Sequence, residues 1–206
     1  VRDIAGGQLT LTRESDREYT FVMPDSSVSV TGYFVREGET MFRDVPADAY
    51  YYEAVQWAVE TGVTGGVGDD LFAPDAACTR AQIVTFLWRA AGSPEPQSKA
   101  DFTDVPANAY YAKAVAWALE NGITKGTSAT TFSPDDPCTR AQAVTFLARA
   151  LSAKAEGTAD FLDVAESAYY CGAVAWAAEN DVTSGVGGKR FAPDQTCTRA
   201  QIAAFL

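Results

Sequence analysis

The stretch Cys78-Thr79-Arg80-Ala81-Gln82 decides the fold of this chain, because the chain contains it three times. It returns as Cys138-Thr139-Arg140-Ala141-Gln142 and again as Cys197-Thr198-Arg199-Ala200-Gln201. The copies are spaced by 60 and then 59 residues. A period in this range is typical of units that are too small to bury their apolar faces alone and therefore stack on one another. We therefore expect three copies of one structural module.

Other motifs recur in step with this stretch. Phe42-Arg43-Asp44-Val45 is the first of three Phe-x-Asp-Val turns, and a tryptophan follows each of their phenylalanines after 15 residues. In the first copy, apolar residues at helical spacing predict a helix over about 51–61, which Gly62 ends. A second helix is predicted to begin at Thr79 and to end at Gly92. The equivalent helices are predicted over 111–121, 139–151, 170–180 and 198–206.

These patterns predict a mainly α fold of three helix-loop-helix repeats. The repeats are expected to occupy residues 38–95, 96–157 and 158–206. Residues 1–37 differ and are predicted to be β-rich. Apolar and polar residues alternate over 19–23 and over 28–32, and a Pro-Asp-Ser-Ser cluster separates the two runs. Such a pattern predicts a small β-hairpin, with a weaker strand over 8–12. We interpret 1–37 as the tail of an upstream β-module and a linker, and the chain as a piece of a longer protein.

The composition argues against several classes of function. The chain has 206 residues, with 16 basic and 27 acidic side chains and a net charge of −11, which disfavours nucleic acid and anionic membrane surfaces as partners. It has no histidine, the commonest general base and metal ligand. No run approaches the roughly 18 apolar residues of a membrane-spanning helix, so we predict no membrane insertion. Any acidic ligand must then be captured by local geometry.

Three of the four cysteines occupy equivalent positions just before a predicted helix. Cys78, Cys138 and Cys197 are interpreted as buried thiols that pack as small apolar groups. A metal site made of these three cysteines is an alternative, and a disulfide from Cys171 is another. The first interpretation is preferred, so no metal and no cofactor are expected.

The Thr-x-x-Gln frame predicts a capping box at the start of each second helix. Thr79 would accept a hydrogen bond from the backbone N–H of Gln82, whose side chain would return to the N–H of Thr79. Gln142 and Gln201 are expected to do the same in the other repeats.

The arginine of the motif needs a different explanation. A cation in the first helical turn opposes the helix dipole and costs a few tenths of a kcal/mol, about 0.3 or more. Its recurrence as Arg80, Arg140 and Arg199 therefore indicates a specific partner. One candidate is an ion pair with a carboxylate such as Asp44 or Glu60, or Asp75. The other is a carboxylate or phosphate ligand at the helix N-terminus, and the two are compatible.

Further recurring residues are candidate ligand contacts. The tryptophans lie beside the apolar helix stripe and are core residues in the alternative interpretation. The glycines could let a ligand approach backbone amides or could only turn the chain. One tyrosine of each adjacent pair, such as Tyr50 and Tyr51, could line a groove. The predicted binding set beyond the arginines and glutamines is Trp57, Trp117, Trp176, Asp44, Asp104, Asp163, Gly66, Gly126 and Gly185.

In their constant order, the Phe-x-Asp-Val, Ala-Val-x-Trp-Ala, Gly-Val-Thr-x-Gly, Phe-x-Pro-Asp and Thr-Arg-Ala-Gln motifs resemble three tandem S-layer homology modules over about 42–206. The family's usual Thr-Arg-Ala-Glu carries Gln here in all three copies, which preserves capping and removes a charge. Within the segment before them, residues 19–30 resemble the end of a β-repeat of Gram-positive surface proteins.

The resemblance implies a pseudo-threefold helical bundle whose intermodule grooves bind secondary cell-wall polysaccharide, often pyruvylated. It implies Arg80, Arg140 and Arg199 as ligand contacts, a secreted protein at the bacterial cell wall or S-layer, and a monomer with internal symmetry. A structural or protein-interaction module without glycan binding is the alternative. Catalysis is not expected, because the recurring carboxylates are typical of scaffolding and no nucleophile motif is present.

Overall fold

The computed structural model describes residues 2–3, 12–13, 19–23, 28–29 and 42–206. The chain divides into two units, Val1–Met41 and Phe42–Leu206. In the first unit, β1 (Arg2–Asp3) pairs antiparallel with β4 (Val28–Ser29), and β2 (Thr12–Arg13) pairs antiparallel with β3 (Tyr19–Thr20).

The predicted hairpin needs correction in its pairing. Its two strands were expected to pair with each other, but the described residues of β3 pair with β2, and those of β4 pair with β1. Alternation identifies a strand and its two faces without selecting the neighbouring strand. The expected turn at 24–27 and residues 30–32 and 8–11 lie outside the described residues.

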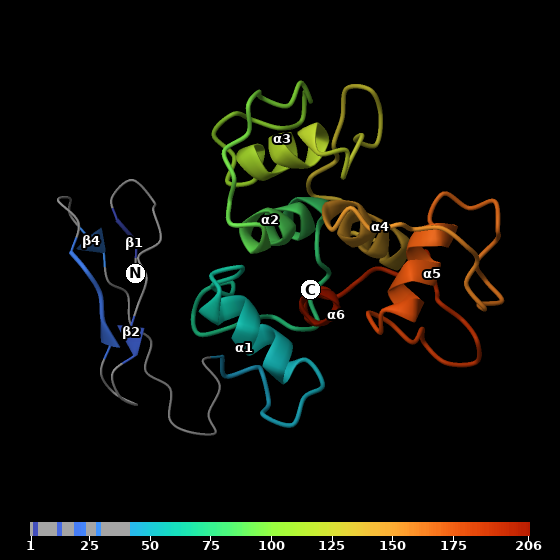
Figure 1. The fold of residues 1–206 in the computed structure, drawn as a ribbon, viewed down its shortest axis with the longest axis horizontal. Helices are drawn as coiled ribbons and strands as arrows, with labels where there is room; N and C mark the ends of the chain where they lie inside the picture. The colour runs from blue at the N-terminus through green and yellow to red at the C-terminus, as the bar shows by residue number, and fades with distance from the viewer. Residues whose placement is uncertain (1, 4–11, 14–18, 24–27, 30–41) are drawn as a thin grey trace. The chain divides into compact units, whose positions relative to one another are not determined.

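The second unit contains six helices, two in each repeat (Figure 1). They lie where the apolar spacing predicts them and begin one residue after the expected starts. Their bounds are α1 Tyr52–Glu60, α2 Arg80–Ala90, α3 Ala112–Glu120, α4 Arg140–Ala150, α5 Cys171–Glu179 and α6 Arg199–Phe205. None of the described helices is long and apolar enough to cross a membrane.

The second helix of each repeat packs against the first helix of another repeat. Helix α2 contacts α3, α4 contacts α5, and α6 contacts α1. The second helices also contact one another, α2 with α4 and α4 with α6, and Figure 1 shows these three meeting between the first helices. The last repeat therefore packs against the first, and the repeats follow one another in a closed cycle.

A cycle of backbone hydrogen bonds joins the three cysteines of the repeated motif. The N–H of Cys78 donates to the carbonyl of Cys197 at 2.9 Å, that of Cys138 to Cys78 at 2.8 Å, and that of Cys197 to Cys138 at 2.9 Å. All three thiols are free and fully buried, as predicted, and burial raises the pKa of Cys78 and Cys197 to about 12. Cys171 is free as well. No cluster that could hold a metal ion occurs among the described residues.

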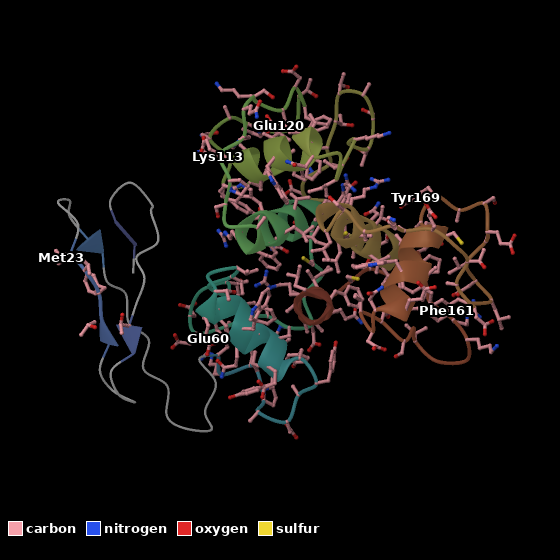
Figure 2. The ribbon with its side chains drawn as sticks, viewed as in Figure 1. Met23, Glu60, Lys113, Glu120, Phe161 and Tyr169 are labelled. Atoms are coloured by element: carbon pink, nitrogen blue, oxygen red, sulfur yellow. The ribbon has the colours of Figure 1, made fainter. Side chains whose placement is uncertain are left out.

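The buried apolar clusters also combine side chains from different repeats. One buried cluster draws on all three repeats and includes Val84, Val115 and Ile202. Another joins the second and third repeats around Val144 and Val174. Glu120, labelled at α3 in Figure 2, fixes the linker between the first two repeats. Its carboxylate accepts the N–H groups of Gln97 and Ser98.

The Phe-x-Asp-Val turn is bonded to the Phe-x-Pro-Asp loop of its own repeat. The carboxylate of Asp104 accepts the N–H of Phe132 at 2.8 Å and that of Ser133 at 2.7 Å, and Asp44 and Asp163 make the same pair of bonds. Ser133 lies in the left-handed region, with φ at +57°. The aspartate thus holds a strained turn that fixes the position of the buried Phe132.

We predict that Asp104→Asn lowers the free energy of unfolding at pH 7 by about 1–3 kcal/mol, because an amide can accept only one of the two bonds as strongly. Partial burial alone would raise the pKa of Asp104, but the N–H groups of Phe132 and Ser133 lower it below its usual value. The carboxylate therefore stabilises the fold above the usual Asp range, and this contribution is lost as pH falls through the lowered pKa.

Urea unfolding at pH 7 and pH 3 measures both effects. The variant should lose less stability between the two pH values than the wild type does. Asp101→Asn, which changes an exposed aspartate, is the control and should match the wild type. An unchanged pH dependence in Asp104→Asn would contradict this account.

Candidate functional site

The arginine of each repeated motif reaches into the next repeat. Its Nε–H donates to the backbone carbonyl of the Phe-x-Pro-Asp phenylalanine, at 2.9 Å from Arg80 to Phe132 and 2.8 Å from Arg140 to Phe191. Arg199 closes the cycle by donating to the carbonyl of Phe72 at 2.8 Å. Each of the three arginines is only 3% exposed.

Each guanidinium group lies over the faces of two aromatic rings. The Cζ atom of Arg80 lies 4.8 Å from the ring centre of Phe132 and 5.4 Å from that of Phe146. Arg140 and Arg199 make the same two contacts with the equivalent phenylalanines. A cation over an aromatic face is favourable and becomes more so when water is excluded.

The ion-pair alternative for these arginines is not observed. Within residues 42–206, no carboxylate forms an ion pair with any of the three, and burial lowers their pKa. The Nη2 atom of Arg140 donates to the hydroxyl of Thr183 at 3.2 Å, whereas the Nη2 atoms of Arg80 and Arg199 are buried without a hydrogen-bond partner. Arg80 and Arg199 therefore retain unused donors.

One cavity of about 390 Å³ lies beside Arg80, and we name it the Lys125 groove. Arg80 comes from the first repeat, whereas the loop 124–127 and part of α4 come from the second, and Tyr169 comes from the third. In Figure 2, Tyr169 lies on the side of the third repeat that is nearest to α4. The residues of α4 that line the groove are Gln142, Thr145, Phe146 and Arg149.

A second cavity, of about 700 Å³, lies beside Arg140, and we name it the Ser184 groove. The third repeat supplies the loop 182–186 and part of α6, and the first repeat supplies Tyr50. Its further lining residues are Phe161, Ala178, Asp181, Gln201, Ala204 and Phe205. Both grooves therefore combine an arginine, a glycine-containing loop and a tyrosine from three different repeats.

The family comparison agrees with this threefold recurrence. The family model of the S-layer homology domain matches residues 42–84, 101–144 and 160–203, which together form more than half of the chain. The chain belongs to the S-layer homology domain family.

Proteins similar to the chain carry surface-layer names. The "Cell surface protein" of Thermoanaerobacter kivui is 36% identical over 120 residues, which are 56% of this chain and 16% of that protein. The "Surface-layer 125 kDa protein" of Lysinibacillus sphaericus is 38% identical over 108 residues, 52% of this chain and 9% of that protein. The "S-layer protein sap" of Bacillus anthracis is 27% identical over 170 residues, 80% of this chain and 20% of that protein.

The chain spans no more than about a fifth of the length of these relatives. A protein named "Amylopullulanase", from Thermoanaerobacterium thermosulfurigenes, is 25% identical over 181 residues, and the chain spans 10% of it. The S-layer homology repeats and the surface-layer relatives support an anchoring module with a cell-surface, cell-wall-associated location. The family model does not match residues 1–37, and the β-repeat in this segment stays a prediction.

The glutamines of the S-layer homology repeats form the predicted capping boxes. Thr79, Thr139 and Thr198 each accept the N–H of the glutamine three residues later, and each glutamine side chain accepts the threonine N–H in return. Gln142 and Gln201 also line the two grooves. Capping therefore accounts for their position, and a ligand contact stays a prediction.

The predicted tryptophans lie away from the two grooves and differ in burial. Trp117 is 8% exposed in the core and Trp57 is 39% exposed, whereas Trp176 packs against both apolar clusters. None of them is among the residues that line the Lys125 groove or the Ser184 groove. The aspartates of the predicted set bond the turns described above and are also absent from the lining.

The predicted glycines have a steric role in every S-layer homology repeat. Gly126 has φ at +81°, and a Cβ atom there would lie 2.5 Å from the carbonyl oxygen of Thr131 and 2.7 Å from the ring of Phe102. Gly66 and Gly185 have equivalent surroundings. Gly126 and Gly185 also line the grooves, so turning the chain and forming the groove are compatible.

Several groove residues were not singled out from the sequence. Lys125 and Asp181 each occur in one repeat only, so recurrence does not mark them, and Arg149 recurs as Arg89 outside the motifs that recurrence identified. The tyrosine pairs left one question open, which the structure answers. Tyr50 and Tyr169 are the members that line the grooves, and they are 71% and 66% exposed.

We predict that Arg140→Ala lowers the free energy of unfolding by about 3 kcal/mol, because it removes buried hydrogen bonds and two ring contacts and leaves a cavity. Arg43→Ala, at an exposed arginine, is the control and should change stability by less than about 0.5 kcal/mol. Thermal or urea unfolding measures both. Equal stability of the two variants would show that Arg140 does not hold the repeats together.

We also predict that Gly126→Ala costs about 2–4 kcal/mol, because the backbone is left-handed and the added methyl group meets Thr131 and Phe102. Gly122→Ala separates the two causes. Gly122 has φ at +67° but no atom within 4 Å of an added Cβ, so its cost should be about 1 kcal/mol. Equal losses of unfolding free energy would refute the steric role of Gly126.

Proposed function

We propose that the chain is a non-covalent cell-wall anchor that binds secondary cell-wall polysaccharide through its arginine-bearing intermodule grooves. The observation that carries the proposal is the convergence of Arg80, the loop 124–127 and Tyr169 from three repeats on one cavity. Hydrogen-bond donors beside an exposed aromatic ring suit a sugar, whose hydroxyl groups and apolar face need both.

The ligand we propose is a polysaccharide that carries carboxylates, such as a pyruvate ketal on a sugar. Arg80 offers a guanidinium group whose Nη2 lacks a partner, and such a group binds carboxylates strongly. Its ring contacts and its Nε bond hold it in place before any ligand arrives, which reduces the entropy cost of binding. The chain's net charge of −11 makes such local preorganisation necessary for an acidic ligand.

We infer that the closed cycle of contacts is a pseudo-threefold bundle, and that the chain acts as a monomer. Tyr110 and Arg199 are the counterparts of the groove tyrosines and arginines, and they lie close enough for an ionised Tyr110 to act on the pKa of Arg199. Up to three weak sites on one rigid unit would bind a repetitive polymer with avidity. Trp57, Trp117, Trp176, Asp44, Asp104, Asp163 and Gly66 stay predicted ligand contacts, for which the structure supports a scaffolding role.

A second candidate function is a protein-interaction module that has kept the fold without glycan binding. The burial of the three arginines and their bonds to backbone carbonyls favour it, because these contacts alone explain the motif. We propose no catalytic role. Among the residues lining the two grooves, Asp181 is the single carboxylate, and glycoside hydrolysis needs two carboxyl groups.

We predict that a Tyr50→Ala, Tyr110→Ala, Tyr169→Ala triple variant binds purified sacculi of the producing bacterium at least about tenfold more weakly than the wild type. The tyrosines are exposed, so the fold should survive, whereas alanine at the three buried arginines would confuse binding with unfolding. Acid extraction of the secondary polymer from the sacculi should abolish wild-type binding.

The control is a Leu119→Ala, Leu151→Ala, Leu162→Ala triple variant. It removes three exposed apolar side chains that line neither groove and should bind like the wild type. Undiminished binding after acid extraction would refute the polysaccharide ligand. Absence of wild-type binding to intact sacculi would favour the protein-interaction module.

A further inference from the structure

The two grooves share one framework, which permits a position-by-position comparison. Each contains the motif arginine, a threonine and a glycine of the loop, the capping glutamine, a helix phenylalanine and an exposed tyrosine. The pairs of equivalent residues are Arg80 and Arg140, Thr124 and Thr183, Gly126 and Gly185, Gln142 and Gln201, Phe146 and Phe205, and Tyr169 and Tyr50. Differences elsewhere in the lining therefore decide how the ligands differ.

Three equivalent positions differ in chemistry. Where the Lys125 groove has Lys125, Thr127 and Thr145, the other groove has Ser184, Val186 and Ala204. The Lys125 groove has a cation and two hydroxyl groups at these positions. The Ser184 groove has one hydroxyl group and two apolar side chains there. The change is consistent in direction at all three positions.

One further residue increases the contrast. Asp181 lines the Ser184 groove and places a carboxylate there, whereas the equivalent residue of the second repeat is Gly122, which does not line the Lys125 groove. Among the positions that both grooves share, the Lys125 groove therefore has two basic side chains, those of Arg80 and Lys125. The Ser184 groove has the basic Arg140 at these positions and the acidic Asp181 beside them.

The buried Nη2 donors of the two motif arginines also differ, and the difference again favours an anion in the Lys125 groove. Thr183 accepts a hydrogen bond from the Nη2 of Arg140, so this donor is already used. The Nη2 of Arg80 has no partner, although Arg80 is only 3% exposed. Asp104 and Asp136 lie close enough to act on the charge of Arg80, but neither lines the cavity. An unpartnered buried donor among basic residues is best satisfied by an anion.

We propose that the grooves are not equivalent: the Lys125 groove binds the carboxylate-bearing sugar, whereas the Ser184 groove binds an uncharged sugar through its apolar wall. Lys125 is then the residue that determines this specificity. The inference rests on the proposed polysaccharide ligand and adds which groove receives the charge. A carboxylate entering the Ser184 groove would meet Asp181, and like charges repel.

The test exchanges the two residues at the deciding position. The probes are the 4,6-pyruvate ketal of methyl glucoside and its methyl ester, which has the same shape without the charge. Binding is followed by amide chemical shifts of the 206-residue chain, with residues 124–127 and 182–186 reporting on the two grooves separately. Lys125→Ser and Ser184→Lys alter exposed loop side chains, and thermal unfolding verifies that both variants fold.

We expect the charged probe to shift the amides of 124–127 in the wild type and to leave 182–186 unchanged. Lys125→Ser should weaken this binding about tenfold, towards that of the ester. Ser184→Lys should leave the first groove as it was and produce charge-dependent shifts at 182–186.

Three results would overturn the inference. They are equal shifts in both grooves of the wild type, equal effects of the ketal and its ester, and charged-probe binding that Lys125→Ser does not weaken. Binding to intact sacculi is measured on the same samples. If the wild type binds sacculi and any of these results is found, only the assignment of grooves is refuted. If the wild type does not bind sacculi, the polysaccharide ligand itself is refuted.

Discussion

The structure depends on a single recurring contact, the bond from a buried arginine Nε to a phenylalanine carbonyl of the following repeat. The contact places a cation over two aromatic rings and joins two repeats through a backbone carbonyl whose position the Asp turn fixes. Without it, the second helix of each repeat would keep only backbone bonds to the neighbouring loop, such as those from the N–H groups of Arg80 and Ala81 to the carbonyls of Asp136 and Pro134. The same side chain also forms one wall of the grooves, so cohesion between repeats and the geometry of the candidate site come from the same residue.

This double role explains what could and could not be predicted from the sequence. The helices and capping boxes depend on residues within four positions of one another, so they can be predicted without knowing which distant residues they contact. Their recurrence in three copies strengthens that prediction. The partner of Arg80 lies 52 residues away and that of Arg199 lies 127 residues away. Because both partners are backbone carbonyls, no side chain in the sequence marks them. The carboxylates expected to pair with the arginines are partly used elsewhere, since Asp44 bonds the N–H groups of Phe72 and Ala73.

The candidate site was predictable in its recurring part only. Recurrence identifies what all three repeats need to fold, which includes the arginines, the glutamines and the glycines. It hides what distinguishes one groove from another, because Lys125 and Asp181 each belong to a single repeat. Selectivity depends on residues that differ among structurally equivalent positions, and these residues are identified by comparing the linings of the two cavities.

The closure of the last repeat on the first has a consequence for how the protein is made. Helix α1 finds its packing partner in α6, and Phe72 receives its arginine only from Arg199. During synthesis, therefore, the first repeat cannot form this interface until the second repeat and α6 of the third have been made. A chain that stops early leaves two open interfaces, one at each end of the broken cycle. The cycle can therefore close only after α6 has been made, and a product that stops before α6 would expose the surfaces of α1 and Phe72 that the third repeat covers.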